Sequence, residues 1–193
     1  MYLSSAQLAT LRSWLNSNAI GLNDEDAINL LNATASPNYY VWRTNMRIEE
    51  IYDKITWVNF TPSDDPDSNV IWTNRSLACQ GKQFNLQTML IGSTGSLNPT
   101  KSGIRAGLND ATTNLPSGPA GTLRSGGWSG ILTTLYRLCT VGEKLYSVVA
   151  TGTGNNGANP RGDVTNPDAL GIDGHGAYLE GLITIANVSE ARQ

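Results

Sequence analysis

The apolar residues of this chain recur mainly at intervals of three and four, which is the spacing of one face of an α-helix. This pattern predicts a mainly α fold. The first predicted helix has Ser4 as its N-cap and Gln7 three residues later, and this pair is typical of a capping box. The apolar face of that helix consists of Leu8, Leu11 and Leu15.

Two further helices are expected before residue 60. One begins at Asn23 or Asp24, where acidic residues suit the first turn, and its predicted apolar side is Ile28, Leu30 and Leu31. The other begins at about Asn45, and its predicted apolar side is Ile48, Ile51, Tyr52 and Ile55. Between them, residues 39–44 are rich in aromatic and β-branched side chains, which predicts either a short strand or a buried connector.

The middle of the chain predicts two more helices. The first spans about residues 73–91, and its predicted buried side chains are Leu77, Phe84, Leu86, Met89 and Leu90. The second begins at Asn98-Pro99, because proline suits the first position of a helix. Its apolar stripe is Ile104, Leu108, Ala111 and Leu115.

The strongest periodic signal lies in residues 128–149 and predicts one long helix. Apolar or small residues alternate there with steps of four and three: Trp128, Leu132, Leu135, Cys139, Gly142, Tyr146 and Val149. Gly142 within this stripe permits a neighbouring helix to approach closely, at a cost in helix propensity of up to about 1 kcal/mol relative to alanine.

The amino-acid composition of the chain changes after Ala150. Residues 151–176 are rich in Gly, Asn and Pro and predict a loop, whereas residues 177–185 alternate as a strand does. No partner strand is evident in the sequence, so we expect this strand to pair with another polypeptide. The predicted interface residues of this arm are Tyr178, Leu179, Leu182, Ile183 and Ile185.

These elements predict a helical bundle with a Gly-rich loop and an extended C-terminal β arm. Residues 1–150 are expected to form the helical body, and residues 151–193 the loop and the arm. At 193 residues, the chain is long enough for one well-buried core.

Composition adds a prediction about assembly. Charged residues make up 15% of the chain, below the roughly 25% of an average soluble protein. Interface cores are depleted of charge and rich in aromatic residues, and this chain has five Trp and seven Tyr, so neighbouring subunits are expected to cover much of its surface. Simple compositional drift is the alternative. A net charge of −3 disfavours direct nucleic-acid binding.

The candidate chemical motifs predict no catalytic residues, no cofactor and no metal. Cys79 and Cys139 lie far apart inside helix-like runs, and His175 is the sole histidine. Residues 152–157 match a dinucleotide-binding pattern, but no helical pattern follows them. The acidic loop 63–69 lacks the ligand spacing of a calcium site. A small hydrolase or nucleotide-binding enzyme stays as an alternative, because an active site can be assembled from distant residues.

Neither a basic and apolar leader nor an apolar stretch of about 18 residues is evident, so we expect synthesis in a cytoplasm and no membrane partner.

Several motifs along most of the chain resemble a group of tailed-bacteriophage virion proteins of about this size. They are Ala35-Ser36-Pro37, Val41-Trp42-Arg43-Thr44, Thr73-Asn74-Arg75, the run from Gln83 to Leu90, Glu143-Lys144-Leu145, the run from Ala150 to Gly154, Glu180-Gly181, and the run from Val188 to Arg192. The segment 155–176 is longer than is usual in that group.

This resemblance implies a virion component assembled in the cytoplasm of a host bacterium. By its layout, the chain is similar to head-to-tail connector (adaptor) proteins, which form a ring beneath the portal. The expected partners are copies of the chain itself, the portal and other head or tail proteins, with DNA only as passing cargo. A capsid-associated cement protein or a minor tail protein is the alternative within the virion.

Overall fold

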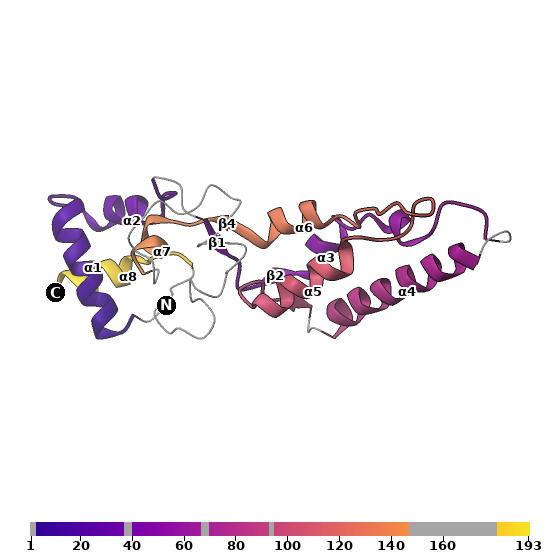
Figure 1. Cartoon of the computed structure of the whole chain (residues 1–193). Coiled ribbons are helices and arrows are strands. Elements are labelled where there is room, and N and C mark those ends of the chain that lie inside the picture. Colours follow the sequence, from indigo (N-terminus) through magenta and orange to yellow (C-terminus); the bar gives the residue numbers. More distant parts are fainter. Residues whose placement is uncertain (1–2, 37–39, 67–69, 93–94, 147–180) are drawn as a thin grey trace. The chain divides into compact units, whose positions relative to one another are not determined.

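The computed structural model describes residues 3–36, 40–66, 70–92, 95–146 and 181–193 (Figure 1). The fold is mainly helical, as the sequence predicted. The chain divides into two compact units. The terminal unit comprises residues 1–41 and 137–193, and the central unit is Trp42–Tyr136. The prediction of one helical body over residues 1–150 is therefore wrong, because the C-terminal residues pack with the N-terminal helices.

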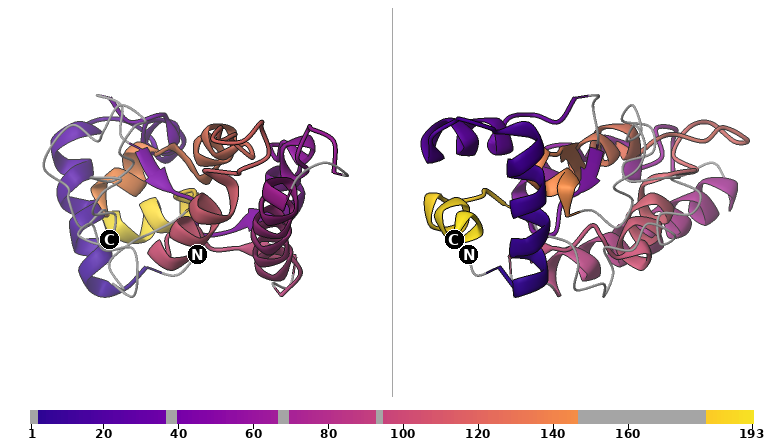
Figure 2. Two further views of the ribbon diagram at one scale, coloured as in Figure 1. Left: turned by 45° about the vertical axis from the view of Figure 1, so that its right-hand side comes forward. Right: turned by 90° about the vertical axis from the view of Figure 1, so that its left-hand side faces the viewer.

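The terminal unit contains the helices α1 (Ser5–Asn18), α2 (Asp24–Asn32), α7 (Val141–Leu145) and α8 (Ile185–Arg192). The C-terminal helix α8 lies beside α1 and α2 (Figure 2). Segments from both ends of the chain thus share one apolar core, which consists of Leu3, Leu11, Leu15, Ala19, Ala27, Leu31, Tyr146, Ile183, Val188 and Ala191.

The helix starts of the terminal unit agree with the predicted caps. The Ser4 hydroxyl accepts the backbone N–H of Gln7 at 3.3 Å, and Gln7 Oε1 accepts the backbone N–H of Ser4 at 2.9 Å. Asn23 is the N-cap of α2. The predicted burial of Leu30 is wrong, because Ala27 and Leu31 form the inner stripe of this short helix and Leu30 faces solvent.

The central unit contains α3 (Ile48–Tyr52), the 3₁₀ helix η1 (Trp57–Phe60), α4 (Val70–Ile91), α5 (Ser102–Thr112) and α6 (Trp128–Leu135). Strand β2 (Met46–Arg47) pairs antiparallel with β3 (Ser96–Leu97). Helix α4 packs along α5 (Figure 1). The two helices come so close that a Cβ atom on Gly107 of α5 would lie 2.7 Å from the Met89 side chain of α4.

Residues 39–44 were predicted as a strand or a connector, and a strand is found there. Strand β1 (Tyr40–Trp42) pairs with β4 (Tyr136–Leu138), and the boundary between the two units falls within both strands.

The prediction of one long helix over residues 128–149 is wrong. Helix α6 ends at Leu135, β4 follows, and α7 begins at Val141. Thr140 starts the new helix, because its hydroxyl accepts the backbone N–H of Glu143 at 3.2 Å while the Glu143 carboxylate accepts that of Thr140 at 2.9 Å. Thr140 and Glu143 are thus a capping box in the middle of the predicted helix.

A close approach is found at Gly142, but the nearest neighbour is Ile183, which lies outside any helix, rather than the predicted neighbouring helix. A Cβ atom on Gly142 would lie 2.8 Å from Cγ1 of Ile183 and 3.4 Å from the backbone oxygen of Leu31. Gly142 therefore leaves the space in which the C-terminal segment meets α2 and α7.

Candidate interaction surfaces

The predicted C-terminal arm is only partly within the described residues. Tyr178 and Leu179 lie outside them, as do His175 and the dinucleotide-like pattern of residues 152–157. Residues 182–184 belong to no strand, and Ile185 begins α8. The strand prediction is wrong for this part, because Thr184 and Asn187 form a capping box that starts a helix.

The three described arm residues differ in their exposure. Leu182 and Ile185 are 61% and 59% exposed, whereas Ile183 is 1% exposed. The Asn32 side chain accepts the backbone N–H of Ile183 and donates to its carbonyl oxygen, both at 2.9 Å. A side-chain amide of α2 therefore makes the backbone hydrogen bonds of Ile183, which were expected from a strand of another polypeptide.

The buried carboxylate of Glu143 in α7 binds the start of the C-terminal segment. Glu143 is 1% exposed, and its two oxygens accept hydrogen bonds from the Arg137 guanidinium at 2.8 and 2.5 Å. One of these oxygens also accepts the backbone N–H of Gly181 at 2.9 Å. Burial alone raises the pKa of Glu143, but the hydrogen bonds from Arg137, Gly181 and Thr140 outweigh it and hold that pKa below its usual range.

Polar contacts also join α8 to the N-terminal helices. Arg12 Nε donates to the carbonyl oxygen of Ala191 at 2.6 Å, and Arg192 forms an ion pair with Asp24 at 2.8 Å. Arg192 also donates to the carbonyl oxygen of Leu22 at 2.9 Å. Helix α8 is therefore part of the terminal unit rather than an arm that protrudes from it.

Helix α4 of the central unit has two faces of different character. Its buried residues are Arg75, Cys79, Leu86 and Leu90. On the opposite side lie Val70, Leu77, Phe84 and Ile91, spaced seven residues apart and between 61% and 78% exposed. The predicted burial of Leu77 and Phe84 is thus wrong, because the residues that contact the rest of the unit lie on the other face of this helix.

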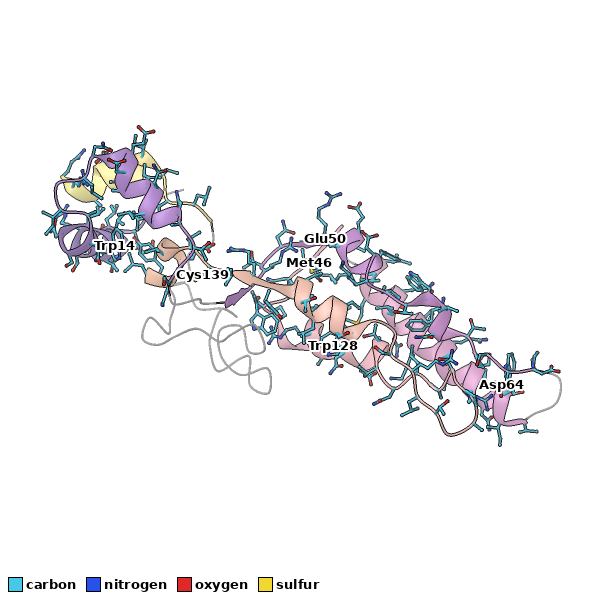
Figure 3. All side chains as sticks on the ribbon, turned by 90° about the horizontal axis from the view of Figure 1, so that it is seen from above. Trp14, Met46, Glu50, Asp64, Trp128 and Cys139 are labelled. Atoms are coloured by element: carbon cyan, nitrogen blue, oxygen red, sulfur yellow. The ribbon has the colours of Figure 1, made fainter. Side chains whose placement is uncertain are left out.

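The two charged residues of α4 are both engaged inside the central unit. The guanidinium of Arg75, a buried side chain, forms an ion pair with Asp64. Asp64 is labelled in Figure 3, near the start of α4. Lys82 pairs with Asp110 of α5 at 3.5 Å. The hydrogen bond from Arg75 also holds the pKa of Asp64 below its usual range. The solvent-facing side of α4 is therefore uncharged along its whole length.

The acidic loop before α4 shows no metal centre within the described residues. Asp64 is committed to Arg75, and Asp67 lies outside the described ranges. In the part of the chain that the structure describes, no group of three or more His, Cys, Asp or Glu side chains is placed to hold a metal ion.

A small aromatic cluster lies at the surface near η1. Tyr52 stacks on Trp57 with 5.6 Å between ring centroids, and Trp57 lies 5.8 Å from Phe60. Phe60 is buried, whereas Val58 on the same short helix is exposed. This is a second apolar surface, which we call the aromatic cluster.

Two open hollows lie along α1 in the terminal unit. One, of about 540 Å³, is lined by Ala9, Thr10, Ser13, Trp14, Ser17 and Leu145. The other, of about 660 Å³, lies around Ala19 and Leu22 and includes Arg192, which is already paired with Asp24. The first lining combines hydroxyl groups with apolar ones, and the second combines apolar groups with Asn16 and Arg192.

The two cysteines are buried, and neither is paired with the other. Burial raises the pKa of the Cys79 thiol, and burial together with the nearby Glu143 raises that of Cys139 to about 11. Since the thiolate is the reactive form, both thiols are poor nucleophiles near neutral pH.

Within the described residues, none of the helices combines the length and the apolar character that a membrane crossing requires. No family model, no curated protein and no solved structure matches this chain.

Proposed function

We propose that this chain is a structural subunit of a tailed-bacteriophage virion and that it serves as a head-to-tail connector. It would act mechanically, by joining copies of itself to the portal and to tail components. Sequence motifs similar to those of phage virion proteins support this proposal. The single structural observation that supports it best is the uncharged outer face of α4, which exposes the large apolar side chains of Val70, Leu77, Phe84 and Ile91.

Exposed apolar surface favours an assembling subunit over a freely diffusing one. Five of the fourteen large apolar side chains that are exposed in the described residues lie on α4: Val70, Ile71, Leu77, Phe84 and Ile91. Exposed large apolar residues that gather on one helix are typical of protein interaction sites. The net charge of −3 agrees with a conduit that passes DNA without holding it.

In this role, helical surfaces rather than a C-terminal strand would make the main contact with neighbouring subunits. Gly181 and Ile183 donate their backbone N–H groups within the terminal unit, and Ile183, Val188 and Ala191 lie in its apolar core. Pairing with another polypeptide stays a prediction for the residues before Gly181, including Tyr178 and Leu179. A capsid-associated cement or minor tail protein is the runner-up, since such a protein would also present uncharged apolar surface.

Binding to purified virion parts separates these two roles. The full chain, incubated with portal rings and with empty capsids of the phage that encodes it, is expected to co-sediment with the portal rings only. A connector must recognise the portal, whereas a cement protein must recognise the capsid lattice. Binding to capsids alone would favour the cement role, and failure to bind either structure would contradict the proposed function.

A further inference from the structure

We propose that the outer face of α4 is a self-association surface that packs antiparallel against the α4 face of a second copy of this chain. The face consists of the large residues Val70, Leu77, Phe84 and Ile91, and of the smaller residues Asn74, Gly81 and Thr88 between them. All seven are exposed. We call this set the α4 ridge. The inference goes beyond the proposed function, because it names a contact between two copies rather than a place in a virion.

The spacing of the ridge is that of a helix–helix seam. Its residues alternate with steps of four and three over the 22 residues of α4, so they keep an average period of 3.5. That period holds a seam against a partner helix along its full length, which is about 33 Å here. A helix face that contacts only water is not expected to carry a large apolar residue at every seventh position.

The sizes of the side chains favour an antiparallel partner of the same sequence. In an antiparallel pair, each large position of one ridge faces a small position of the other. One register places Leu77 opposite Gly81, Val70 opposite Thr88 and Phe84 opposite Asn74. A register shifted by seven residues places Phe84 opposite Gly81 and keeps the same rule. A parallel pair would instead stack Phe84 on Phe84 and leave Gly81 facing Gly81.

Gly81 is the notch that such a pair requires. It lies in the middle of the ridge, and a Cβ atom built there meets nothing within 4 Å in the chain itself. Its conformation is not left-handed, so the backbone does not require glycine there. Glycine in a helix interior costs about 1 kcal/mol relative to alanine. Glycine at position 81 leaves room for a side chain of the partner copy, and that contact would offset the cost.

The charges permit two identical faces to meet. The positions that flank the ridge are also uncharged, and they include Ile71, Thr73, Ala78, Gln80 and Asn85. Arg75 and Lys82 are held by Asp64 and Asp110. Bringing two copies together therefore buries no unpaired charge and creates no like-charge repulsion. A two-fold contact of this kind closes on itself, so a ring of the chain would need another surface as well.

The mass of the purified full chain tests this inference. By light scattering after size exclusion, the wild-type chain is expected to form a dimer whose proportion rises with concentration. Leu77→Glu and Phe84→Glu should each weaken dimerisation by about 30-fold or more, because they place charge at the centre of the contact. Leu123→Glu, at an exposed leucine of the same unit outside α4, should leave the dimer unchanged.

Gly81→Leu separates association from folding. Leucine is a better helix former than glycine and has open space in the single chain, so the variant should unfold at an equal or higher temperature. It should nevertheless be monomeric, since the added side chain fills the notch that the partner needs. A Gly81→Leu variant that dimerises like the wild type would overturn the proposal.

Cysteine cross-linking tests the direction of the pair. Leu77→Cys and Gly81→Cys chains, mixed and then oxidised, should form a covalent heterodimer, whereas each variant alone should not. Gly81→Cys mixed with Phe84→Cys tests the shifted register in the same way. The native cysteines are buried and do not compete. Cross-linking of Leu77→Cys to itself would indicate a parallel pair and contradict the arrangement.

The remaining outcomes also decide the question. A wild-type chain that is monomeric at every concentration overturns self-association, even if it binds portal rings. If Leu77→Glu then abolishes portal binding, the ridge belongs to a different partner. A dimer that fails to bind portal or capsid would instead support the ridge and contradict the proposed function.

Discussion

Deleting residues 182–193 is expected to unfold the terminal unit while the central unit stays folded. The deletion removes Ile183, Val188 and Ala191 from the apolar core that they share with α1 and α2. Each of these side chains is at most 1% exposed, and burying a residue such as valine or isoleucine contributes about 1.5–3 kcal/mol. Loss of several such groups exceeds what a small unit can tolerate, since whole domains are stable by only about 5–15 kcal/mol.

Hydrogen exchange followed residue by residue is the appropriate measurement. In the truncated chain, the amides of α1 and α2 should lose their protection, and those of α4 and α5 should keep it. A matched control, Leu182→Ser with Ile185→Ser, changes two exposed side chains of the same segment and should leave α1 and α2 protected. Protection of α1 and α2 that survives the truncation would show that the C-terminal segment is dispensable for the unit.

Replacing Arg137 by methionine is expected to destabilise the terminal unit by about 3 kcal/mol. The substitution leaves the Glu143 carboxylate buried without its cation, and breaking a buried pair in this way costs about 3–5 kcal/mol. We expect a loss of stability at the lower end of this range, because a third of the Arg137 side chain is exposed and water therefore screens the pair. Urea unfolding of the two chains measures the difference. A double variant, Arg137→Met with Glu143→Leu, should be destabilised by less than the sum of its single changes.

The pH dependence of stability gives an independent check on Glu143. Its pKa in the folded chain lies below the ordinary value of 4.5, so its contribution to stability is complete above that value. The contribution is lost as the pH falls through the lower pKa of the folded chain. Glu143→Gln should therefore reduce the acid sensitivity of the terminal unit. An unchanged acid transition would contradict this role.

The N-terminal helices could be predicted because their signals are local. Ser4 and Gln7, and likewise Asn23, act on backbone groups only three residues away, so the sequence pattern and the structure agree on these helix starts. The break after Leu135 was missed although Thr140 and Glu143 carried the same kind of signal. An apolar stripe that continues in phase across the break concealed it.

The packing of the C-terminal segment against the N-terminal helices could not be predicted from the sequence. Ile183 is held by Asn32, which precedes it by 151 residues, and no local pattern reports a contact across that separation. The exposure of the α4 ridge was missed for a related reason. Leu77 and Phe84 have the spacing of buried residues, and spacing alone does not distinguish a face that packs within the chain from one that packs on another chain.

Counting copies of the chain in purified virions tests the central claim most directly. Quantitative mass spectrometry against a labelled standard, normalised to the portal protein, is the measurement. A connector predicts roughly a dozen copies per particle, in a fixed ratio to the portal. Hundreds of copies, or a chain that is absent from the finished particle, would contradict the account.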